Sequence, residues 1–190
     1  RAGLFNDLDV SLDWHPDDEN KANMQSSQAM IDLLVSFKGT SSHAAFDPWN
    51  GKSALDAAEL FTTGVNFFRE HVRPTVRMHY VYKNGGNVPN VVPDQASVWL
   101  WLRDSKRSGL TVVEDRIRDI AKGAALMAGV TSEVKIQSGD YELLVNEAGA
   151  NVLQKNMESL GPINYTPDEI EFGKQIQKQA GLAQTGFKGE

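Results

Sequence analysis

Four histidines and no cysteine are the starting point for any metal or acid–base chemistry in this sequence. His15, His43, His71 and His79 are scattered, and no two of them show an HxxxH or HExxH spacing. A catalytic zinc needs about three protein ligands and an open position. We therefore expect no complete metal site in this chain. The absence of cysteine also excludes disulfides, thiolate nucleophiles and thiolate metal ligands.

His43 is the histidine best placed for catalysis, because it lies in a loop of small residues, Gly39-Thr40-Ser41-Ser42-His43-Ala44-Ala45. Small neighbours allow a backbone to approach a ligand closely. An imidazole there could donate a hydrogen bond to a reacting group. The alternative is a surface loop histidine without a role.

Asn90 and Arg103 are candidates for binding a carboxylate. Arg103 ends a predicted strand and offers a planar fork of donors that matches a carboxylate. Asn90 offers an amide just before the turn at Val91-Val92-Pro93. The alternatives are ordinary turn chemistry for Asn90 and, for Arg103, a surface ion pair with a nearby aspartate, which would contribute little.

His15 is a candidate ligand-binding residue, because it follows a segment in which Leu8, Val10, Leu12 and Trp14 alternate with polar residues. That alternation predicts a strand. Open α/β sheets bind ligands beyond the carboxyl ends of their strands. The alternative is a loop histidine whose pKa is raised by the acidic residues around it.

These residues must be positioned by a folded scaffold, which we read from hydrophobic periodicity. Between residues 28 and 138 the predicted order is β-α-β-β-α-β, an α+β, two-layer, ferredoxin-like arrangement. The predicted strands are 29–38, 75–83, 96–103 and 132–138, and the predicted helices are 53–72 and 110–128. Ser53 is the expected N-cap of the first helix, and Thr111 with Glu114 a capping box in the second.

Two helices can cover only one face of a four-stranded sheet. Strand parity places Arg77, His79, Trp99 and Trp101 on the uncovered face. Large apolar surface facing water suggests a covering subunit or domain. The alternative is a partly solvated face on which the tryptophans are amphipathic.

The segments before and after the predicted ferredoxin-like domain do not continue its pattern of strands and helices. We expect residues 1–27 and 140–190 to belong to another domain, with residues 28–139 inserted between them. The last segment is predicted to be helical, with Thr166 as an N-cap and Pro167 at the first helical position. The start Arg1-Ala2-Gly3-Leu4 has neither an initiator Met nor a signal-peptide pattern, so we expect it to lie inside a longer product.

Composition narrows the class of protein further. The 190 residues are 41% hydrophobic and 23% charged, with a net charge of −6. The negative charge gives no general attraction to nucleic acid or anionic lipid. No apolar run approaches the roughly 20 residues of a membrane helix. We therefore expect a globular protein of the cytoplasm, without nucleic-acid or membrane partners.

Two motifs resemble a known family. The segment from Gly39 to Ala45, followed by Pro48, Gly51 and Ala54, is similar to a G-x-x-S/A-H-A-x…P…G-x-x-A pattern. The segments Gly85-Gly86, Asn90-Val91-Val92-Pro93 and Arg103 are similar to a G-G…N-V-I-P…R pattern. Both belong to the lid, or dimerisation, domain of zinc-dependent amidohydrolases of the aminoacylase and carboxypeptidase type. In members of that family the lid is inserted into an α/β catalytic domain.

The resemblance implies a role for each candidate residue. His43 would reach across a homodimer and stabilise the oxyanion in the partner's active site, while Asn90 and Arg103 grip a substrate carboxylate. His15 would be one ligand of a site for two divalent metal ions, zinc or manganese. The family's H-x-C-G-H-D motif and paired glutamates are missing, so no complete metal site is expected in this chain, and the chain alone should be inactive. The implied substrates are N-acyl amino acids, with aminobenzoyl-glutamate as a candidate.

Two other classes of function remain open from the residues alone. A ferredoxin-like domain could bind a small regulatory molecule. It could also be a purely structural oligomerisation module, which would keep the Trp99 and Trp101 surface but tolerate loss of His43 and Arg103.

Overall fold

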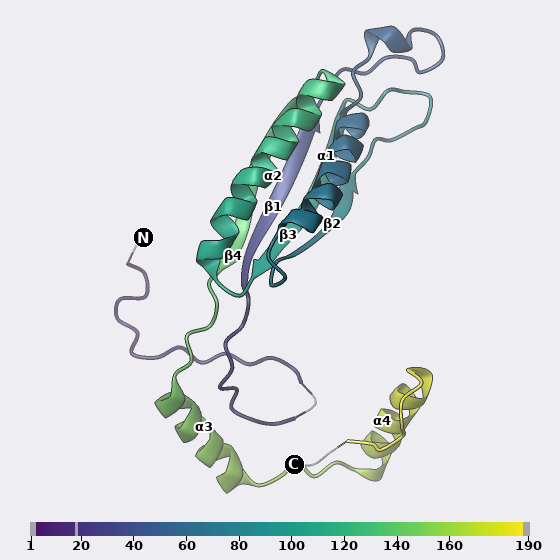
Figure 1. The fold of residues 1–190 in the computed structure, drawn as a ribbon. Coiled ribbons are helices and arrows are strands. Elements are labelled where there is room, and N and C mark those ends of the chain that lie inside the picture. Colours follow the sequence, from purple (N-terminus) through teal and green to yellow (C-terminus); the bar gives the residue numbers. More distant parts are fainter. Residues whose placement is uncertain (1–2, 18, 188–190) are drawn as a thin grey trace. The chain divides into compact units, whose positions relative to one another are not determined.

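The computed structural model describes residues 3–17 and 19–187. The chain forms two compact units (Figure 1). One unit spans residues 25–145, and the other combines the N-terminal segment up to Met24 with the C-terminal segment from Asn146. The assignment of the outer segments to a catalytic domain stays a prediction.

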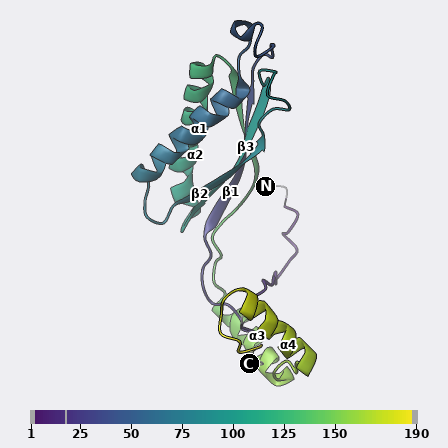
Figure 2. The same cartoon turned by 90° about the vertical axis from the view of Figure 1, so that its right-hand side faces the viewer.

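The larger unit is a four-stranded antiparallel sheet with two helices on one face (Figures 1 and 2). Along the chain its elements are β1 (Ala29–Lys38), α1 (Ala54–Phe68), β2 (Arg77–Asn84), β3 (Gln95–Asp104), α2 (Arg107–Ala128) and β4 (Thr131–Asp140). Two short 3-10 turns, η1 (Pro48–Asn50) and η2 (Arg69–His71), flank α1. The strand order β2-β3-β1-β4 confirms the predicted ferredoxin-like arrangement.

The core lies between the sheet and the two helices, as the period-two and period-3.6 patterns predict. Alternate residues of the central strands are fully buried, and α1 and α2 contribute one apolar stripe each. The largest of these side chains are Ile31, Leu33, Val35, Phe37, Phe61, Val65, Val98, Leu100, Leu102, Leu110 and Ile117. Each such burial contributes about 1.5–3 kcal/mol, so the core fixes which residues of every strand face away from the helices.

The ends of the helices agree only in part with the sequence patterns. Ser53 caps α1 as predicted, because its Oγ accepts a hydrogen bond from the backbone N–H of Asp56 at 3.1 Å. The capping box predicted at Thr111 is wrong, since α2 begins at Arg107. There the backbone N–H of Arg107 donates to the carboxylate of Glu142 at 2.9 Å. That hydrogen bond lowers the pKa of Glu142 below 4.5.

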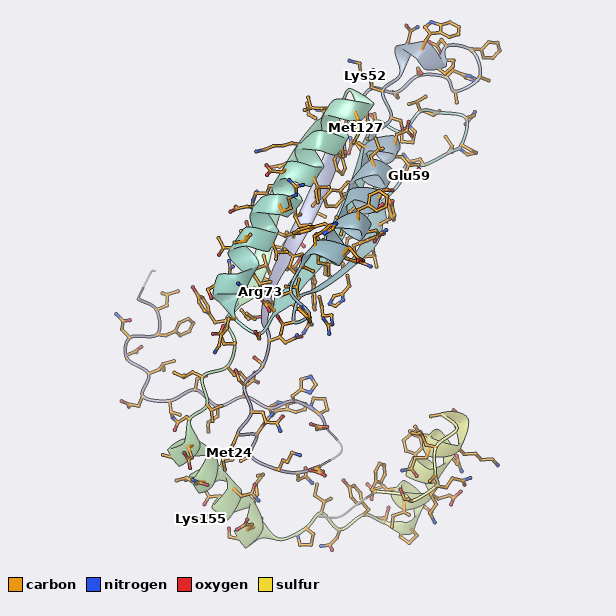
Figure 3. All side chains as sticks on the ribbon, viewed as in Figure 1. Met24, Lys52, Glu59, Arg73, Met127 and Lys155 are labelled. Carbon is orange, nitrogen blue, oxygen red and sulfur yellow. The ribbon has the colours of Figure 1, made fainter. Side chains whose placement is uncertain are left out.

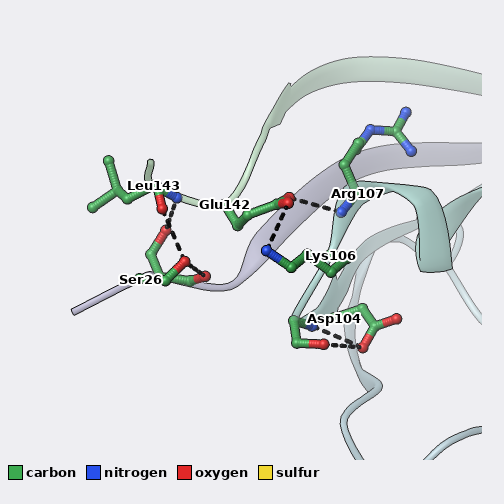
Figure 4. A network of polar contacts seen from close by, with 8 residues as sticks. Ser26, Asp104, Lys106, Arg107, Glu142 and Leu143 are labelled. Atoms are coloured by element: carbon green, nitrogen blue, oxygen red, sulfur yellow. Dashed lines mark hydrogen bonds and ion pairs between the residues drawn. The ribbon is translucent and has the colours of Figure 1, made fainter. Parts of the chain in front are cut away.

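The chain enters and leaves the larger unit side by side (Figure 4). Ser26 Oγ donates to the carbonyl of Leu143 at 2.9 Å, and the N–H of Leu143 donates to Ser27 Oγ at 3.0 Å. Glu142 lies beside these connectors and also pairs with Lys106 at 3.3 Å. The two ends of the larger unit therefore lie close together, as they do in many domains.

The smaller unit contains α3 (Glu147–Leu160) and α4 (Pro167–Gln179). Thr166 caps α4 as predicted, and Glu169 completes a capping box with it. The strand predicted before His15 is wrong: Leu8 and Trp14 lie in irregular, exposed chain. An alternating segment becomes a strand only when a neighbour pairs with it, and no strand of the described residues does so.

No helix in the described part of the chain is long and apolar enough to cross a membrane.

Candidate functional site

The loop that carries His43 is held by backbone pairing at one end of the sheet. We call residues 39–52 the tip loop. At its base Thr40 and Lys52 exchange two hydrogen bonds of 2.9 and 2.8 Å. Further out, His43 forms a bridge with Val91, in the connection between β2 and β3. The tip loop is therefore fixed at its base and again at the catalytic candidate.

Hydrogen bonds set the tautomer of the His43 imidazole. Its Nδ1 faces the backbone N–H groups of Ala45 and Phe46, each at 3.2 Å. Both are donors, so Nδ1 must be the acceptor and a neutral ring carries its proton on Nε2. Asp47 accepts from the backbone N–H of His43 at 3.0 Å. The His43 side chain is exposed, so Nε2–H is a hydrogen-bond donor on an anchored loop at the surface.

Asn90 lies beside His43. Its carbonyl accepts a hydrogen bond of 2.9 Å from Ala44 N–H. Its side-chain amide is exposed and makes no hydrogen bond within the described residues. The structure therefore brings His43 and Asn90 together at the tip end of the sheet.

Arg103 lies at the opposite end of β3. Gln95 begins that strand near the tip loop, and eight residues at about 3.4 Å each place Arg103 about 27 Å further along. Figure 3 shows these two ends through Lys52, at the base of the tip loop, and Arg73, just before β2. The expectation that Asn90 and Arg103 of one protomer grip the same carboxylate therefore does not fit the geometry of a single chain.

Arg103 belongs to the open face, the side of the sheet that α1 and α2 leave uncovered. As predicted, the open face carries Arg77, His79, Trp99 and Trp101, since the alternate residues of β2 and β3 are buried under the helices. The Arg103 guanidinium lies over the Trp101 ring, 5.2 Å from its centroid. A cation over an indole face is held in place by the ring quadrupole.

The pKa of His79, on the open face, is lowered by its surroundings. Burial lowers its pKa below the usual 6.5, and the positive charges of Arg103, Arg69 and Arg77 lower it further. Each of these causes disfavours the charged imidazolium. The open face is therefore locally cationic, although the whole chain carries a net charge of −6.

His15 presents the opposite tautomer to that of His43. Its Nδ1 lies 2.8 Å from the carbonyl oxygen of Pro16, which can only accept, so Nδ1 carries the proton. Nε2 then keeps its lone pair, the arrangement typical of a metal-ligating histidine whose other nitrogen donates to a carbonyl. His15 lines a hollow of about 590 Å³ within the smaller unit.

The fit to a metal is partial. Among residues 3–17 and 19–187, no group of three or more histidine, aspartate or glutamate side chains could hold an ion. His15 can supply one ligand of suitable chemistry, and further ligands must come from outside the described residues.

Asp47 and Arg77 are functional candidates that the motifs did not identify. Asp47 orients the tip loop by accepting from His43 N–H and from Asn50 Nδ2. The Asp47-Pro48 pair signals a turn, but not which backbone N–H the carboxylate would bind. The alternation of residues along β2 predicted that Arg77 lies on the open face. It could not predict the strand register, which places Arg77 directly opposite Arg103.

Comparison with known families decides what this scaffold is. Residues 26–128 match the M20-type family described as a peptidase dimerisation domain. The chain belongs to this family. The predicted resemblance to the lid of aminoacylase and carboxypeptidase-type amidohydrolases is thereby confirmed.

Curated relatives of this dimerisation-domain chain are hydrolases. It is 38% identical over 180 residues to one of the subunits of the p-aminobenzoyl-glutamate hydrolase of Escherichia coli, covering 93% of this chain and 37% of the relative. It is 36% identical over 161 residues to the human Xaa-Arg dipeptidase, covering 84% and 37%. The chain thus spans less than half the length of these relatives.

Solved structures show the same fold. An aminobenzoyl-glutamate utilization protein from Klebsiella pneumoniae superposes with a TM-score of 0.56 at 23% identity, covering 67% of this chain and 33% of that one. A hydantoinase/carbamoylase family amidase from Burkholderia vietnamiensis gives a TM-score of 0.60 at 17% identity, covering 72% and 33%.

Proposed function

We propose that this chain is the lid and dimerisation part of a metal-dependent amidohydrolase that cleaves the amide bond of N-acyl amino acids. Aminobenzoyl-glutamate is a candidate substrate, because the relative with 38% identity is named for that reaction. The observation that carries the proposal is the exposed His43, anchored with Nε2–H as its donor near the start of β3, while Arg103 lies about 27 Å from Gln95 at the other end of that strand.

Each candidate residue has a defined task in this reaction. His43 donates from Nε2 to the oxygen that becomes negative when water attacks the amide carbonyl; preorganised donors of this kind contribute several kcal/mol. Arg103 binds a substrate carboxylate, with Trp101 beneath its guanidinium. His15 supplies one metal ligand through Nε2. Divalent zinc or manganese ions, when bound, provide the Lewis acid that activates the water.

The distance between the two ends of the sheet argues for a homodimer. A substrate the size of an acyl amino acid cannot span about 27 Å. Arg103 precedes Asp104, the last residue of β3, which lies at the end where the chain enters and leaves the unit (Figure 4). His43 and Asn90 lie at the other end, beside the start of β3. We infer that each active site takes Arg103 from its own subunit and His43 with Asn90 from the partner.

The aromatic tip loop is consistent with that arrangement. Phe46 is 79% exposed and Trp49 is 77% exposed, and both follow His43 along the same loop. Large apolar side chains grouped on a surface mark sites of contact with another protein surface. A partner subunit that receives the tip loop would cover them.

Subunit complementation tests the proposal in the complete protein. His43→Ala and Arg103→Ala subunits should each be inactive as homodimers. When the two are unfolded, mixed and refolded together, half of the dimers are mixed and one of their two sites is intact, so about a quarter of wild-type activity should return. Mixing His43→Ala with Asn90→Ala gives no such recovery, because both changes fall on the same end of the lid.

Three results would each contradict a part of the proposal. Absence of recovery in the His43→Ala and Arg103→Ala mixture would show that both residues serve the same subunit's site or none. A complete protein that dimerises but hydrolyses no N-acyl amino acid with added zinc or manganese would favour a purely structural module. Measurable metal-dependent turnover by the 190-residue chain alone would refute the view that it lacks most of the catalytic site.

A further inference from the structure

Two arginines face each other directly on the open face. Arg77 on β2 and Arg103 on β3 are cross-strand partners in the sheet register. Side chains in such positions have Cβ atoms about 4.5–5.5 Å apart, and like charges there destabilise the sheet. Neither guanidinium makes an ion pair with an acidic side chain of the described residues. This pair is therefore a feature that folding alone does not explain.

The local hydrogen bonds leave donors free on both guanidiniums. Nη1 of Arg77 donates to the carbonyl oxygens of Pro74 and, at 2.8 Å, Val76. This fixes the group and leaves its Nε and Nη2 hydrogens unpaired, which is the edge that binds a carboxylate in a bidentate manner. Arg103 has no hydrogen bond within the described residues and is held by the Trp101 ring.

The acidic residues of the same face do not neutralise this pair. Asp32 is buried, and its carboxylate accepts the Trp99 indole N–H at 2.6 Å. Asp140 lies two strands from Arg103 in the same row, across Met30, which is about 10 Å. Burial, and then the positive charges of Arg103, Arg69 and Arg77, lower the pKa of His79.

Beside the arginine pair lies an aromatic hollow of about 180 Å³, lined by His79, Tyr80, Val81, Trp99 and Trp101. The two tryptophan rings meet edge to face, with centroids 6.0 Å apart. The indole Nε1 of Trp101 is buried and has no hydrogen-bond partner in the part of the chain that the structure describes. A buried donor of this kind needs an acceptor.

We propose that Arg77 and Arg103 together form a site for two carboxylates, so that the substrate amino acid is acidic and Arg77 determines this specificity. The inference rests on the proposed function. It assigns Arg103 to one carboxylate and Arg77 to the second. The proposal also favours a substrate like that of the p-aminobenzoyl-glutamate hydrolase over one like that of the Xaa-Arg dipeptidase. A substrate with an arginine side chain would bring a third guanidinium beside Arg77 and Arg103, and the like charges would repel each other.

Substrate pairs of equal size test this in the complete enzyme. For wild type, kcat/KM for N-acetyl-L-glutamate should exceed that for N-acetyl-L-glutamine by roughly tenfold or more, because a site built for a charged group rejects the analogue that lacks it. Arg77→Gln should remove most of this preference through KM for the glutamate substrate, and leave kcat/KM for the glutamine substrate within about threefold. Arg77→Lys should restore part of the preference, as a point charge without the fork.

A matched control and a second readout keep the test decisive. Arg116→Gln changes the same residue type at an exposed position of α2 and should keep the wild-type preference.

In the 190-residue chain, N-acetyl-L-glutamate should quench the Trp99 and Trp101 fluorescence at lower concentration than N-acetyl-L-glutamine or inorganic sulfate. It should also raise the pKa of His79 in an NMR titration, because bound carboxylates offset the arginine charges. Trp99→Phe with Trp101→Phe should abolish this quenching, while Trp14 and Trp49 still fluoresce.

The outcomes distinguish failure of this inference from failure of the proposed function. Equal loss of activity on both substrates in Arg77→Gln would show a structural role and overturn the inference. So would an unchanged preference, efficient cleavage of Ala-Arg, or equal quenching by sulfate and both acyl amino acids. A change of oligomeric state in Arg77→Gln would show that a second copy covers the open face instead. Absence of any amide hydrolysis by wild type would defeat the proposed function, while the binding measurements would still decide the two-carboxylate site.

Discussion

Replacing Gly39 with alanine tests whether the base of the tip loop is as tightly packed as the structure shows. A Cβ added at Gly39 would lie 1.9 Å from the carbonyl oxygen of Lys52 and 3.1 Å from Cγ1 of Val130. The first contact is with backbone, so no change of side-chain rotamer can relieve it. The Lys52 carbonyl must move, although it accepts a hydrogen bond from Thr40 N–H at 2.9 Å.

The size of the effect follows from the bonds that this movement breaks. Thr40 and Lys52 exchange two backbone hydrogen bonds, each with a net contribution of about 1 kcal/mol. Loss of both lowers the free energy of unfolding by about 2 kcal/mol. For a chain of this length, about 2–4 °C per kcal/mol then gives a fall in melting temperature of roughly 4–8 °C.

Thermal denaturation of the 190-residue chain, followed by circular dichroism, measures this fall. Gly123→Ala is the matched control, because nothing lies within 4 Å of a Cβ added at that position in α2. It should stabilise the chain by about 0.5–1 kcal/mol, the usual gain from alanine over glycine in a helix. If Gly39→Ala melts at or above the wild-type temperature while Gly123→Ala shows its gain, the tip loop is not clamped as described.

Three further predictions concern the tip loop, the core and the last helix. Asp47→Ala should lower kcat of the complete enzyme by roughly tenfold, with little change in melting temperature, because His43 loses the acceptor of its backbone N–H; steady-state kinetics and a thermal melt would decide it. Leu100→Ala should cost about 2–5 kcal/mol in a urea titration, since Leu100 is fully buried between the sheet and the helices. Hydrogen bonds from the backbone and then the side chain of Thr166 hold the pKa of Glu169 below 4.5. As the pH falls, the Glu169 carboxylate therefore takes up its proton at a higher pH in the unfolded chain than in the folded chain. The stabilisation that Glu169 contributes is present above pH 4.5 and is lost as the pH falls through the folded pKa. An NMR titration should give a midpoint below 4.5 that Thr166→Ala moves upward.

Several features of the fold could be predicted from local patterns, because their causes lie within a few residues of sequence. Alternating apolar residues in β1 and β3 decide which side of the sheet is buried, and the helical stripes decide how α1 and α2 cover it. The beginnings of α1 and α4 followed from Ser53 and Thr166, whose side chains accept hydrogen bonds from N–H groups three residues away. The first helix was predicted to run to residue 72, but α1 ends at Phe68. The beginning of α2 did not, because its N–H partner is Glu142, 35 residues further along the chain.

The sequence by itself determined the chemistry available to this protein: which face carries Trp101 and Arg103, which loop carries His43, and which segment carries His15. Tertiary structure decided how these groups combine. Pairing of β2 with β3 set Arg77 against Arg103, and the length of β3 separated Arg103 from Asn90. The segment before His15 gained no strand, because no described neighbour pairs with it. The physical reason is that side-chain orientation follows from local backbone period, whereas distance and register depend on hydrogen bonds between segments far apart in the chain.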